Sequence, residues 1–212
     1  MAERRHVDLY IAGSWQPAMA GGTIDILDPA TEEVVATAAQ AERAEVEAAI
    51  AAAQEAYSSW RQVAAWDRSK MIRKAAQLLE ERAEPIARLL TIETGKPLGQ
   101  AKAELTAAVE LMDWYADEAR RIFGQTLPGR TADSRFMTAY EPVGVVGAFT
   151  AWNFPVVLQV RKITPALATG CTIVTRPAEE GTSSVAGLVK CFIDAGAPAG
   201  TINLVTGKPE VI

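Results

Sequence analysis

The sequence predicts an α/β fold built on a parallel βαβαβ sheet, and three observations carry this prediction. Residues 8–40 show short apolar runs separated by turn residues, and residues 41–124 show helical periodicity. Residues 142–212 alternate strand-like and helix-like stretches joined by short loops. This last pattern implies parallel strands joined by right-handed crossovers, as in one half of a Rossmann-like, doubly wound sheet.

Turn residues set the N-terminal strands apart. The stretch DLYIAGSW at 8–15 predicts a strand that turns at Gly13. The stretch AGGTIDILDPATEEVVATA at 20–38 predicts two further strands, separated by the turn residues Asp28 and Pro29. These short strands precede the helical layer.

Residues 41–124 form the predicted helical layer. Apolar side chains recur there at helical spacing, which we interpret as stripes that face a core. Pro85 suits the first turn of one helix, and Gly95 suits its end. The next helix presents an apolar face that we expect to run from Leu105 to Phe123.

The pattern of apolar residues changes at residue 125 and again at residue 142. The polar stretch 125–141 contains a Pro-Gly pair and predicts a crossover or a hairpin. An apolar run at 143–149 then predicts a buried strand, followed by a helix that ends at Gly170. The strand CTIVT, a helix that ends at Gly196 and a strand in GTINLVTG complete the predicted sheet.

Composition excludes several classes of protein. The net charge is −5 and no Lys/Arg cluster stands out, which argues against a nucleic-acid binder. No apolar run approaches the roughly 20 residues of a membrane-spanning helix, and the first residues lack the apolar core of a signal peptide, so we expect a cytoplasmic protein. A single histidine, His6, and two cysteines predict neither a metal site nor a disulfide framework.

Doubly wound sheets bind ligands at the carboxyl ends of their strands, which are TAWN, TRPAE and VTG in this sequence. The fingerprint G-x-G-x-x-G is absent from the first strand end, and TAWNFP stands in its place at 150–155. Asn153 is a neutral hydrogen-bond donor that suits an oxyanion, or it caps the turn. Trp152 either walls a cofactor pocket or fills the core.

The second strand end carries Arg176 and Glu179. An acid at this place commonly accepts hydrogen bonds from ribose hydroxyls and repels a 2′-phosphate, which favours NAD. A basic residue attracts a 2′-phosphate, which leaves NADP open. A surface ion pair between the two side chains is an equally good interpretation.

Four stretches of the sequence resemble the N-terminal part of the NAD(P)-dependent aldehyde dehydrogenases. They are DPATEEVVATA, IETGKPLGQAKAE, EPVGVVGAFTAWNFPVVLQVRKITPALATGCTIVTRPAEE and GAPAGTINLVTG. The resemblance covers nearly the whole chain. It implies that an aldehyde is oxidised to a carboxylic acid through a cysteine thiohemiacetal and a thioester, with NAD, or alternatively NADP, as the hydride acceptor.

The resemblance also implies roles for individual residues. Asn153 matches the asparagine that holds the oxyanion. The residues that match cofactor-binding positions are Phe149, Thr150, Ala151, Trp152, Arg176, Pro177, Ala178 and Glu179. Two of these depart from the family pattern, because Ala151 stands in place of a proline and Arg176 in place of a lysine.

Arg161 and Phe154 are the candidate substrate residues, on the helix that follows the turn. Family members that oxidise succinate semialdehyde carry an arginine at a place similar to that of Arg161, where it binds the distal carboxylate. A guanidinium is well shaped for that role. The expected partner is therefore an aldehyde, with an acidic semialdehyde as the narrower hypothesis.

Relative to the family, the predicted fold is incomplete. Residues 1–124 correspond to the N-terminal strands and helical layer of the cofactor-binding domain, 125–141 to a crossover or oligomerisation hairpin, and 142–212 to the first half of the dinucleotide-binding unit. The catalytic domain, with its nucleophilic cysteine and general-base glutamate, has no counterpart in the sequence. Cys171 and Cys191 stand in apolar surroundings, and we expect them to be core residues.

Two hypotheses on function stay open. In the first, the chain is the N-terminal part of an aldehyde dehydrogenase that assembles as a homodimer or homotetramer, and the chain alone is inactive. In the second, it is a stand-alone, truncated remnant that binds a nucleotide or a partner without catalysis. Such a product would expose an unpaired sheet edge and an apolar face.

Overall fold

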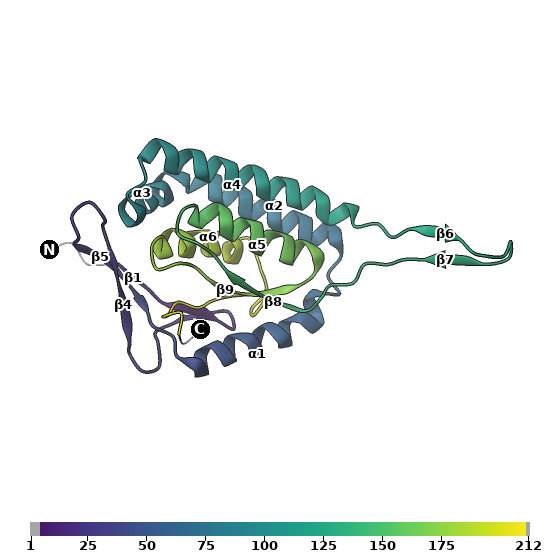
Figure 1. Cartoon of the computed structure of the whole chain (residues 1–212), viewed down its shortest axis with the longest axis horizontal. Helices are drawn as coiled ribbons and strands as arrows, with labels where there is room; N and C mark the ends of the chain where they lie inside the picture. The colour runs from purple at the N-terminus through teal and green to yellow at the C-terminus, as the bar shows by residue number, and fades with distance from the viewer. Residues whose placement is uncertain (1–4, 211–212) are drawn as a thin grey trace.

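The computed structural model describes residues 5–210, which form three β-sheets flanked by helices (Figure 1). The strands are β1 (Arg5–Val7), β2 (Leu9–Ile11), β3 (Ser14–Gln16), β4 (Thr23–Leu27), β5 (Val34–Ala39), β6 (Thr126–Pro128), β7 (Arg135–Met137), β8 (Val145–Phe149), β9 (Thr172–Arg176) and β10 (Ile202–Leu204). The helices are α1 (Arg43–Trp60), α2 (Ala65–Glu81), α3 (Ala83–Thr94), α4 (Leu98–Glu118), the 3₁₀ helix η1 (Ala119–Arg121), α5 (Pro155–Thr169) and α6 (Thr182–Asp194).

The largest sheet has five strands in the order β3-β2-β10-β9-β8. Its last three strands are parallel, and Ile173 of β9 lies opposite Val146 of β8 on one side and Ile202 of β10 on the other. Helices α5 and α6 connect these strands in turn, which confirms the predicted βαβαβ unit. The hairpin of β2 and β3 extends the sheet beyond β10, where Tyr10 pairs antiparallel with Leu204.

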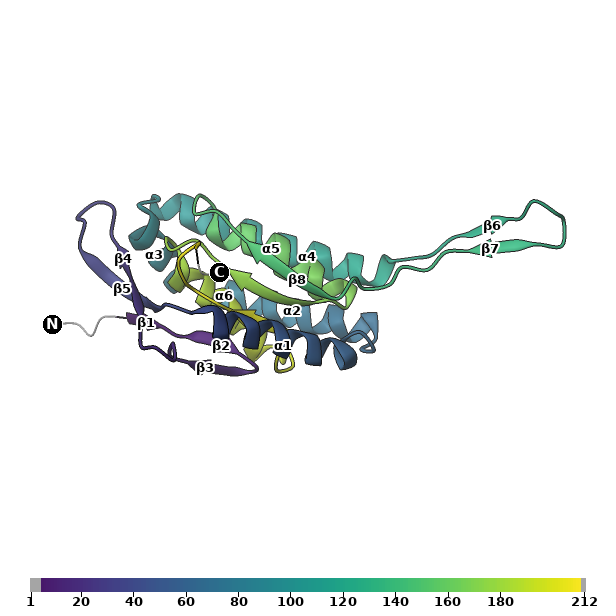
Figure 2. The same cartoon turned by 60° about the horizontal axis from the view of Figure 1, so that its bottom comes forward.

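Helices cover both faces of this sheet (Figure 1, Figure 2). Helices α5 and α6 pack on one face, and α2, α3 and α4 form a second layer outside them. Helix α1 packs on the opposite face. The core between the sheet and α5 and α6 is built from fully buried side chains, among them Ile163, Ile173, Leu188, Phe192 and Leu204.

Local sequence explains where these elements begin and end. The first four residues of β9 are β-branched and buried, as expected for a parallel strand that is covered on both faces. Pro155 begins α5, because a proline at the first helical position gives up an N–H that would have no partner in the helix. Gly95 and Gly170 end α3 and α5 with φ of +70° and +90°, a conformation that favours glycine.

The predicted apolar face from Leu105 to Phe123 is wrong at its C-terminal end. Helix α4 ends at Glu118 and η1 follows, so the helical periodicity stops before Phe123. The Phe123 side chain is 70% exposed. The reason is that the chain leaves the helical layer here and continues toward β6, which carries the Phe123 ring away from the core.

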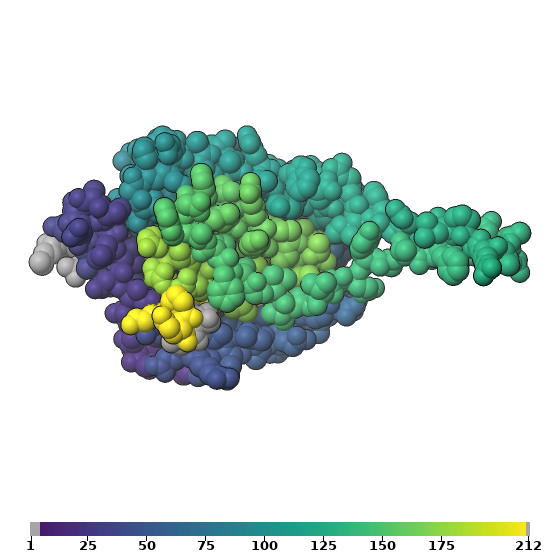
Figure 3. Space-filling view, in the orientation of Figure 1, coloured from purple at the N-terminus to yellow at the C-terminus, as the bar shows by residue number. Residues whose placement is uncertain are grey.

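Strands β6 and β7 form an antiparallel hairpin, at the place where the sequence leaves a crossover or a hairpin open. Thr126 pairs with Met137, and Pro128 pairs with Arg135. Every residue of the two strands is exposed. Figure 3 shows the hairpin as an arm that stands clear of the body of the molecule. Its exposed apolar side chains include Leu127, Phe136 and Met137.

Strand β8 lies at the edge of the five-stranded sheet, and within residues 5–210 no strand pairs with its outer side. The expectation that it is buried is therefore wrong in part. Only Ala148 of β8 is buried, and Phe149 is 64% exposed. The strands of a doubly wound sheet, numbered along the chain, lie in the order 3-2-1-4. Here β8, β9 and β10 correspond to strands 1, 2 and 3 of that order. Strand 4 of such a sheet lies beside strand 1, which is β8 in this protein.

Candidate active site

The carboxyl ends of β8, β9 and β10 meet at one end of the sheet. Phe149, the last residue of β8, lies opposite Arg176, the last residue of β9. The N–H of Val205, just after β10, donates to the carbonyl oxygen of Thr175 at 3.0 Å. In open α/β sheets, ligands bind outside the carboxyl ends of the strands, where the strand order reverses. The free edge of β8 makes this the place to look for a site.

The turn after β8 presents its side chains to solvent. Ala151, Trp152, Asn153 and Phe154 are exposed, whereas Pro155 is buried at the start of α5. The Trp152 side chain is 60% exposed, so the interpretation of Trp152 as a core residue is wrong. Its indole is instead available to line a binding site.

The carboxamide of Asn153 is free to meet a ligand. Within the described part of the chain, this side chain makes no hydrogen bond, and α5 begins without a side-chain cap. The turn-capping interpretation of Asn153 therefore has no support in the geometry. A neutral amide of this kind can donate N–H groups to a developing oxyanion without titrating.

Two residues of the helical layer, Lys96 and Glu104, form hydrogen bonds with the backbone of this turn. Oε1 of Glu104 accepts hydrogen bonds from the N–H groups of Val156 at 2.9 Å and Val157 at 3.2 Å. Glu104 also forms an ion pair with Lys96, whose Nζ donates to the carbonyl oxygen of Asn153 at 2.9 Å. The first turn of α5 and the backbone of Asn153 are thus bonded to one buried pair.

The end of β8 is fixed by a buried amide. Gln159 is fully buried on α5, and its Nε2 donates to the hydroxyl oxygen of Thr150 at 2.8 Å. The Thr175 hydroxyl in turn donates to Oε1 of Gln159. This network ties the half-buried Thr150 to the neighbouring strand, so Thr150 is held in place from inside the protein.

Glu93 caps the first turn of α6, as Glu104 caps the first turn of α5. Its carboxylate accepts hydrogen bonds from the N–H groups of Ser183 at 3.1 Å and Ser184 at 3.3 Å, in the first turn of α6. Burial raises the pKa of Glu93 to about 7. Helix N-termini are common anion sites, but both of these N-termini are already occupied by carboxylates of the chain itself. A dinucleotide must therefore place its phosphates elsewhere.

Arg176 and Glu179 form an ion pair at the end of β9. Nη2 of Arg176 lies 2.5 Å from Oε1 of Glu179 and 2.8 Å from the carbonyl oxygen of Gly207. Their side chains are 12% and 34% exposed, so the pair is partly buried and not a surface pair. Pro177 and Ala178 between them are buried, and their side chains shape the turn from inside.

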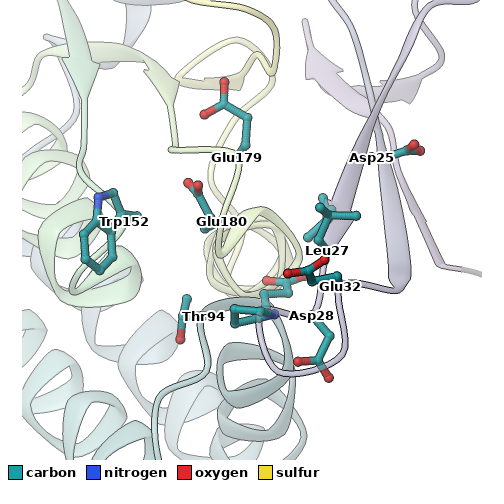
Figure 4. Close-up of a pocket in the computed structure, with 11 residues that line it drawn as sticks. Asp25, Leu27, Asp28, Glu32, Thr94, Trp152, Glu179 and Glu180 are labelled. Carbon is teal, nitrogen blue, oxygen red and sulfur yellow. The ribbon is translucent and has the colours of Figure 1, made fainter.

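A pocket of about 460 Å³ lies beside this ion pair. Figure 4 shows Trp152 on one side of it and Asp25 and Leu27 of β4 on the other, with Glu179 and Glu180 between them. Its acidic lining residues are Asp25, Asp28, Glu32, Glu93, Glu179 and Glu180. In the part of the chain that the structure describes, no group of three or more His, Cys, Asp or Glu residues is placed to hold a metal ion. The acidic lining disfavours a phosphate at this place.

The candidate substrate residues lie together in a second hollow. A groove of about 530 Å³ between α4 and α5 is lined by both Phe154 and Arg161. Its other lining residues are Gln100, Ala103, Glu104, Ala107, Val157 and Leu158. The groove is thus mostly apolar, with an exposed arginine in its lining.

Neither cysteine is placed as a nucleophile. Cys171 and Cys191 are both free and buried. Burial raises the pKa of Cys191 to about 11, and its thiol donates to the carbonyl oxygen of Gly187 at 3.2 Å. A reactive cysteine needs a thiolate and access, which these surroundings do not favour. Both residues are core residues, as the sequence predicts.

Comparison with protein families matches residues 15–212 to the aldehyde dehydrogenase family. The chain belongs to this family. It is 43% identical over 199 residues to the glutarate-semialdehyde dehydrogenase of Pseudomonas putida, and 41% identical over 202 residues to the NADP(+) succinate-semialdehyde dehydrogenase GabD of Escherichia coli. These matches cover 94% and 95% of this chain but only 42% of each relative, so the chain spans less than half the length of these curated aldehyde dehydrogenases.

Solved aldehyde dehydrogenases share the fold. The NAD⁺ complex of an aldehyde dehydrogenase from Bacillus cereus matches with a TM-score of 0.94 and 38% sequence identity, over 98% of this chain and 43% of that one. The α/β fold of the chain is thus that of the family, of which it spans less than half the length. No helix within residues 5–210 has the length and apolarity required to cross a membrane.

The sequence does not reveal the residues whose hydrogen bonds fix the turns and helix starts of the candidate site. It assigns no role to Lys96, Glu104, Glu93 or Gln159, although all four lie in stretches that resemble the family. One signal was present: Glu104 falls within an apolar stripe of α4. An acid inside such a stripe is buried, and a buried acid requires partners.

Proposed function

We propose that this chain is the N-terminal part of an NAD(P)-dependent aldehyde dehydrogenase that oxidises an aldehyde to a carboxylic acid. The longer polypeptide that would carry this sequence is called the intact enzyme below. The observation that carries the proposal is the exposed Asn153 carboxamide, which has no hydrogen bond within the described residues and lies at the carboxyl end of β8. Family membership supplies the reaction class.

Asn153 performs the chain's own part of this chemistry. When a cysteine thiolate of the intact enzyme adds to the aldehyde carbon, the carbonyl π bond breaks and its electron pair moves to oxygen. The Asn153 N–H donates to that oxygen and stabilises the charge as it develops. Bound NAD(P) supplies the hydride acceptor. Hydrolysis of the resulting thioester then releases the acid and restores the thiolate.

The cofactor residues fit a dinucleotide in two places. Phe149, Ala151 and Trp152 offer an exposed surface beside Asn153, and the half-buried Thr150 supports it. Arg176 and Glu179 would face the adenosine ribose, with Pro177 and Ala178 shaping the turn. We propose that NAD is preferred to NADP, because Glu179 already neutralises Arg176 and the neighbouring pocket is acidic.

We propose an acidic semialdehyde as the substrate. The relatives named above act on glutarate and succinate semialdehydes, according to their names. The groove between α4 and α5 supports the same substrate class here, because it is mostly apolar and Arg161 in its lining can pair with a distal carboxylate. Phe154 would contact the aliphatic part of the chain.

The isolated 212-residue chain should not turn over any aldehyde. Its two cysteines are buried, so it offers no thiolate to attack the carbonyl. A homodimer or homotetramer of the intact enzyme is proposed to form through the β6–β7 hairpin, whose apolar side chains are exposed. A cytoplasmic location stays a prediction.

The test is an assay of the protein isolated from cells, with its intact mass measured first. We expect a polypeptide more than twice the mass of this chain, with NADH formed from succinate or glutarate semialdehyde. An Asn153→Ala variant should lower kcat by about 10²- to 10³-fold. A natural product of 22.7 kDa would support the stand-alone alternative and refute the proposal.

A further inference from the structure

A buried ion pair outside the sheet is hydrogen-bonded to the turn that carries Asn153. Lys96 lies in the connection between α3 and α4, and Glu104 lies on α4. The turn that they bind belongs to β8 and α5, about 50 residues further along the chain. The Glu104 side chain is 0% exposed, and the Lys96 side chain is 11% exposed. The pair is therefore largely shielded from solvent and links the outer helical layer to the turn before α5.

Glu104 caps the first turn of α5. The first N–H groups of a helix have no partner inside the helix, and Pro155 brings none. The next two N–H groups, those of Val156 and Val157, both donate to Oε1 of Glu104. Phe154 at the N-cap has no side-chain acceptor of its own. A carboxylate from another helix thus replaces the missing cap.

Lys96 holds the other side of the same turn. Its Nζ donates to the carbonyl oxygen of Asn153 at 2.9 Å and lies 4.2 Å from the centre of the Phe154 ring. Hydrogen bonding and a cation–π contact therefore fix the backbone directly after Asn153. The carboxamide of Asn153 is left free while the peptide that carries it is held.

We propose that Lys96 and Glu104 are positioning residues that fix the backbone of Asn153 and so aim its carboxamide at the reacting carbonyl oxygen. This inference rests on the proposed function. Burial of an ion pair is a costly way to gain stability, because desolvation offsets much of the attraction between the charges. Catalytic geometry explains its presence better, since a misplacement of about 1 Å can lower a rate by about 10²-fold.

The test uses two variants and one matched control. Lys96→Met removes the ammonium group but keeps an unbranched side chain, and Glu104→Met removes the oxygen that accepts from Val156 and Val157. Lys102→Met is the control, because Lys102 is also on α4 but forms an exposed ion pair with Glu84, away from the turn. Amide hydrogen exchange in the 212-residue chain is measured first, and kcat and KM of the intact enzyme second.

We expect faster exchange at Val156 and Val157 in Lys96→Met and Glu104→Met, with no change in Lys102→Met. In the intact enzyme, kcat should fall about tenfold or more, while the KM for NAD stays within about twofold. In a double-mutant cycle, Lys96→Met combined with Asn153→Ala should be no slower than Asn153→Ala alone. A residue with a merely structural role would not produce that non-additivity.

Unchanged exchange at Val156 and Val157 would overturn the proposal. So would an unchanged kcat in Lys96→Met, or losses that multiply fully when Lys96→Met and Asn153→Ala are combined. A wild-type intact enzyme that forms no NADH or NADPH from any aldehyde would instead refute the proposed function. In that case, the exchange result alone decides whether Lys96 and Glu104 hold the turn.

Discussion

Nη2 of Arg176 lies 2.5 Å from Oε1 of Glu179, and the pair is partly buried at the carboxyl end of β9. The guanidinium is further engaged by the carbonyl oxygen of Gly207. Arg176 is therefore not a free cation that awaits a phosphate. From the sequence, Glu179 is a candidate acceptor for ribose hydroxyls and Arg176 is a candidate partner of a 2′-phosphate. In the structure the two side chains neutralise each other.

Removal of the acid should change the preference for the coenzyme. Glu179→Ser removes the ion-pair partner of Arg176 and a charge that repels a 2′-phosphate, an interaction of about 1 to 4 kcal/mol between the limits of water and a protein surface. We expect the ratio of kcat/KM for NADP to that for NAD to rise about tenfold in the intact enzyme. Glu110→Ser, at an exposed acid of α4 that does not line the pocket, is the control. An equal shift in both variants would contradict the role of the pair.

Arg161 should discriminate between substrates by charge. Arg161→Leu removes the partner of a distal carboxylate, so the KM for succinate semialdehyde should rise about tenfold or more, whereas the KM for a neutral aldehyde of similar length should hardly change. Lys162→Leu, the adjacent exposed lysine, is the control variant. An equal rise in KM for both substrates in Arg161→Leu would contradict an ion pair between Arg161 and the distal carboxylate.

Glu93 should make the stability of the chain depend on pH. Its folded pKa of about 7 lies above the usual value of about 4, because burial disfavours the charged form. The folded state therefore binds the proton more tightly, and the stability that this provides is fully present below about pH 4 and is lost as the pH rises to 7.

The comparison variant is Glu93→Gln, which cannot titrate. Between pH 5 and 8, the free energy of unfolding of the wild type should fall by about 1 to 3 kcal/mol relative to Glu93→Gln, as measured by urea denaturation at several pH values. Glu84→Gln, at the exposed start of the same helix, should leave the slope of the wild type unchanged. Parallel curves for the wild type and Glu93→Gln would show that Glu93 does not titrate in this range.

Arg68 should contribute to stability through its buried hydrogen bonds. Its Nε donates to the carbonyl oxygen of Ala168 at 3.0 Å near the C-terminus of α5, and its Nη1 donates to the carbonyl oxygen of Val63. Arg68→Met leaves both acceptors without this partner, so we expect a loss of about 2 to 4 kcal/mol in urea denaturation. Arg73→Met, also on α2, breaks only exposed ion pairs and should cost about 0 to 1 kcal/mol. Equal losses would contradict the assignment.

The sequence predicts those parts of the fold that depend on local patterns. Apolar periodicity and turn residues such as Gly170 and Gly196 are local, so the order of strands and helices from β8 to β10 follows from them. Phe123 shows where periodicity misleads, because it continues an apolar spacing after the helix has ended. A pattern records spacing but not the point where the chain leaves a layer.

The site residues also divide into those that a local pattern predicts and those that only the packing brings together. Asn153 and Trp152 were found because they follow a strand end directly. Lys96 and Glu104 were not, because their partner turn is about 50 residues away in the chain and only the packing of α4 against α5 brings them together. The ion pair of Arg176 and Glu179 remained one alternative of several, since a separation of three residues does not fix a side-chain rotamer.

An assay for NADH formation by the isolated chain shows whether Asn153 depends on a thiolate from the rest of the intact enzyme. The purified chain, with its 212 residues confirmed by intact mass and its fold by circular dichroism, is incubated with NAD and succinate semialdehyde. The intact enzyme serves as the positive control in the same assay. We expect no NADH above the blank, because Asn153 can stabilise an oxyanion only when a thiolate creates one, and both cysteines are buried. Sustained NADH formation by the isolated chain would contradict the account.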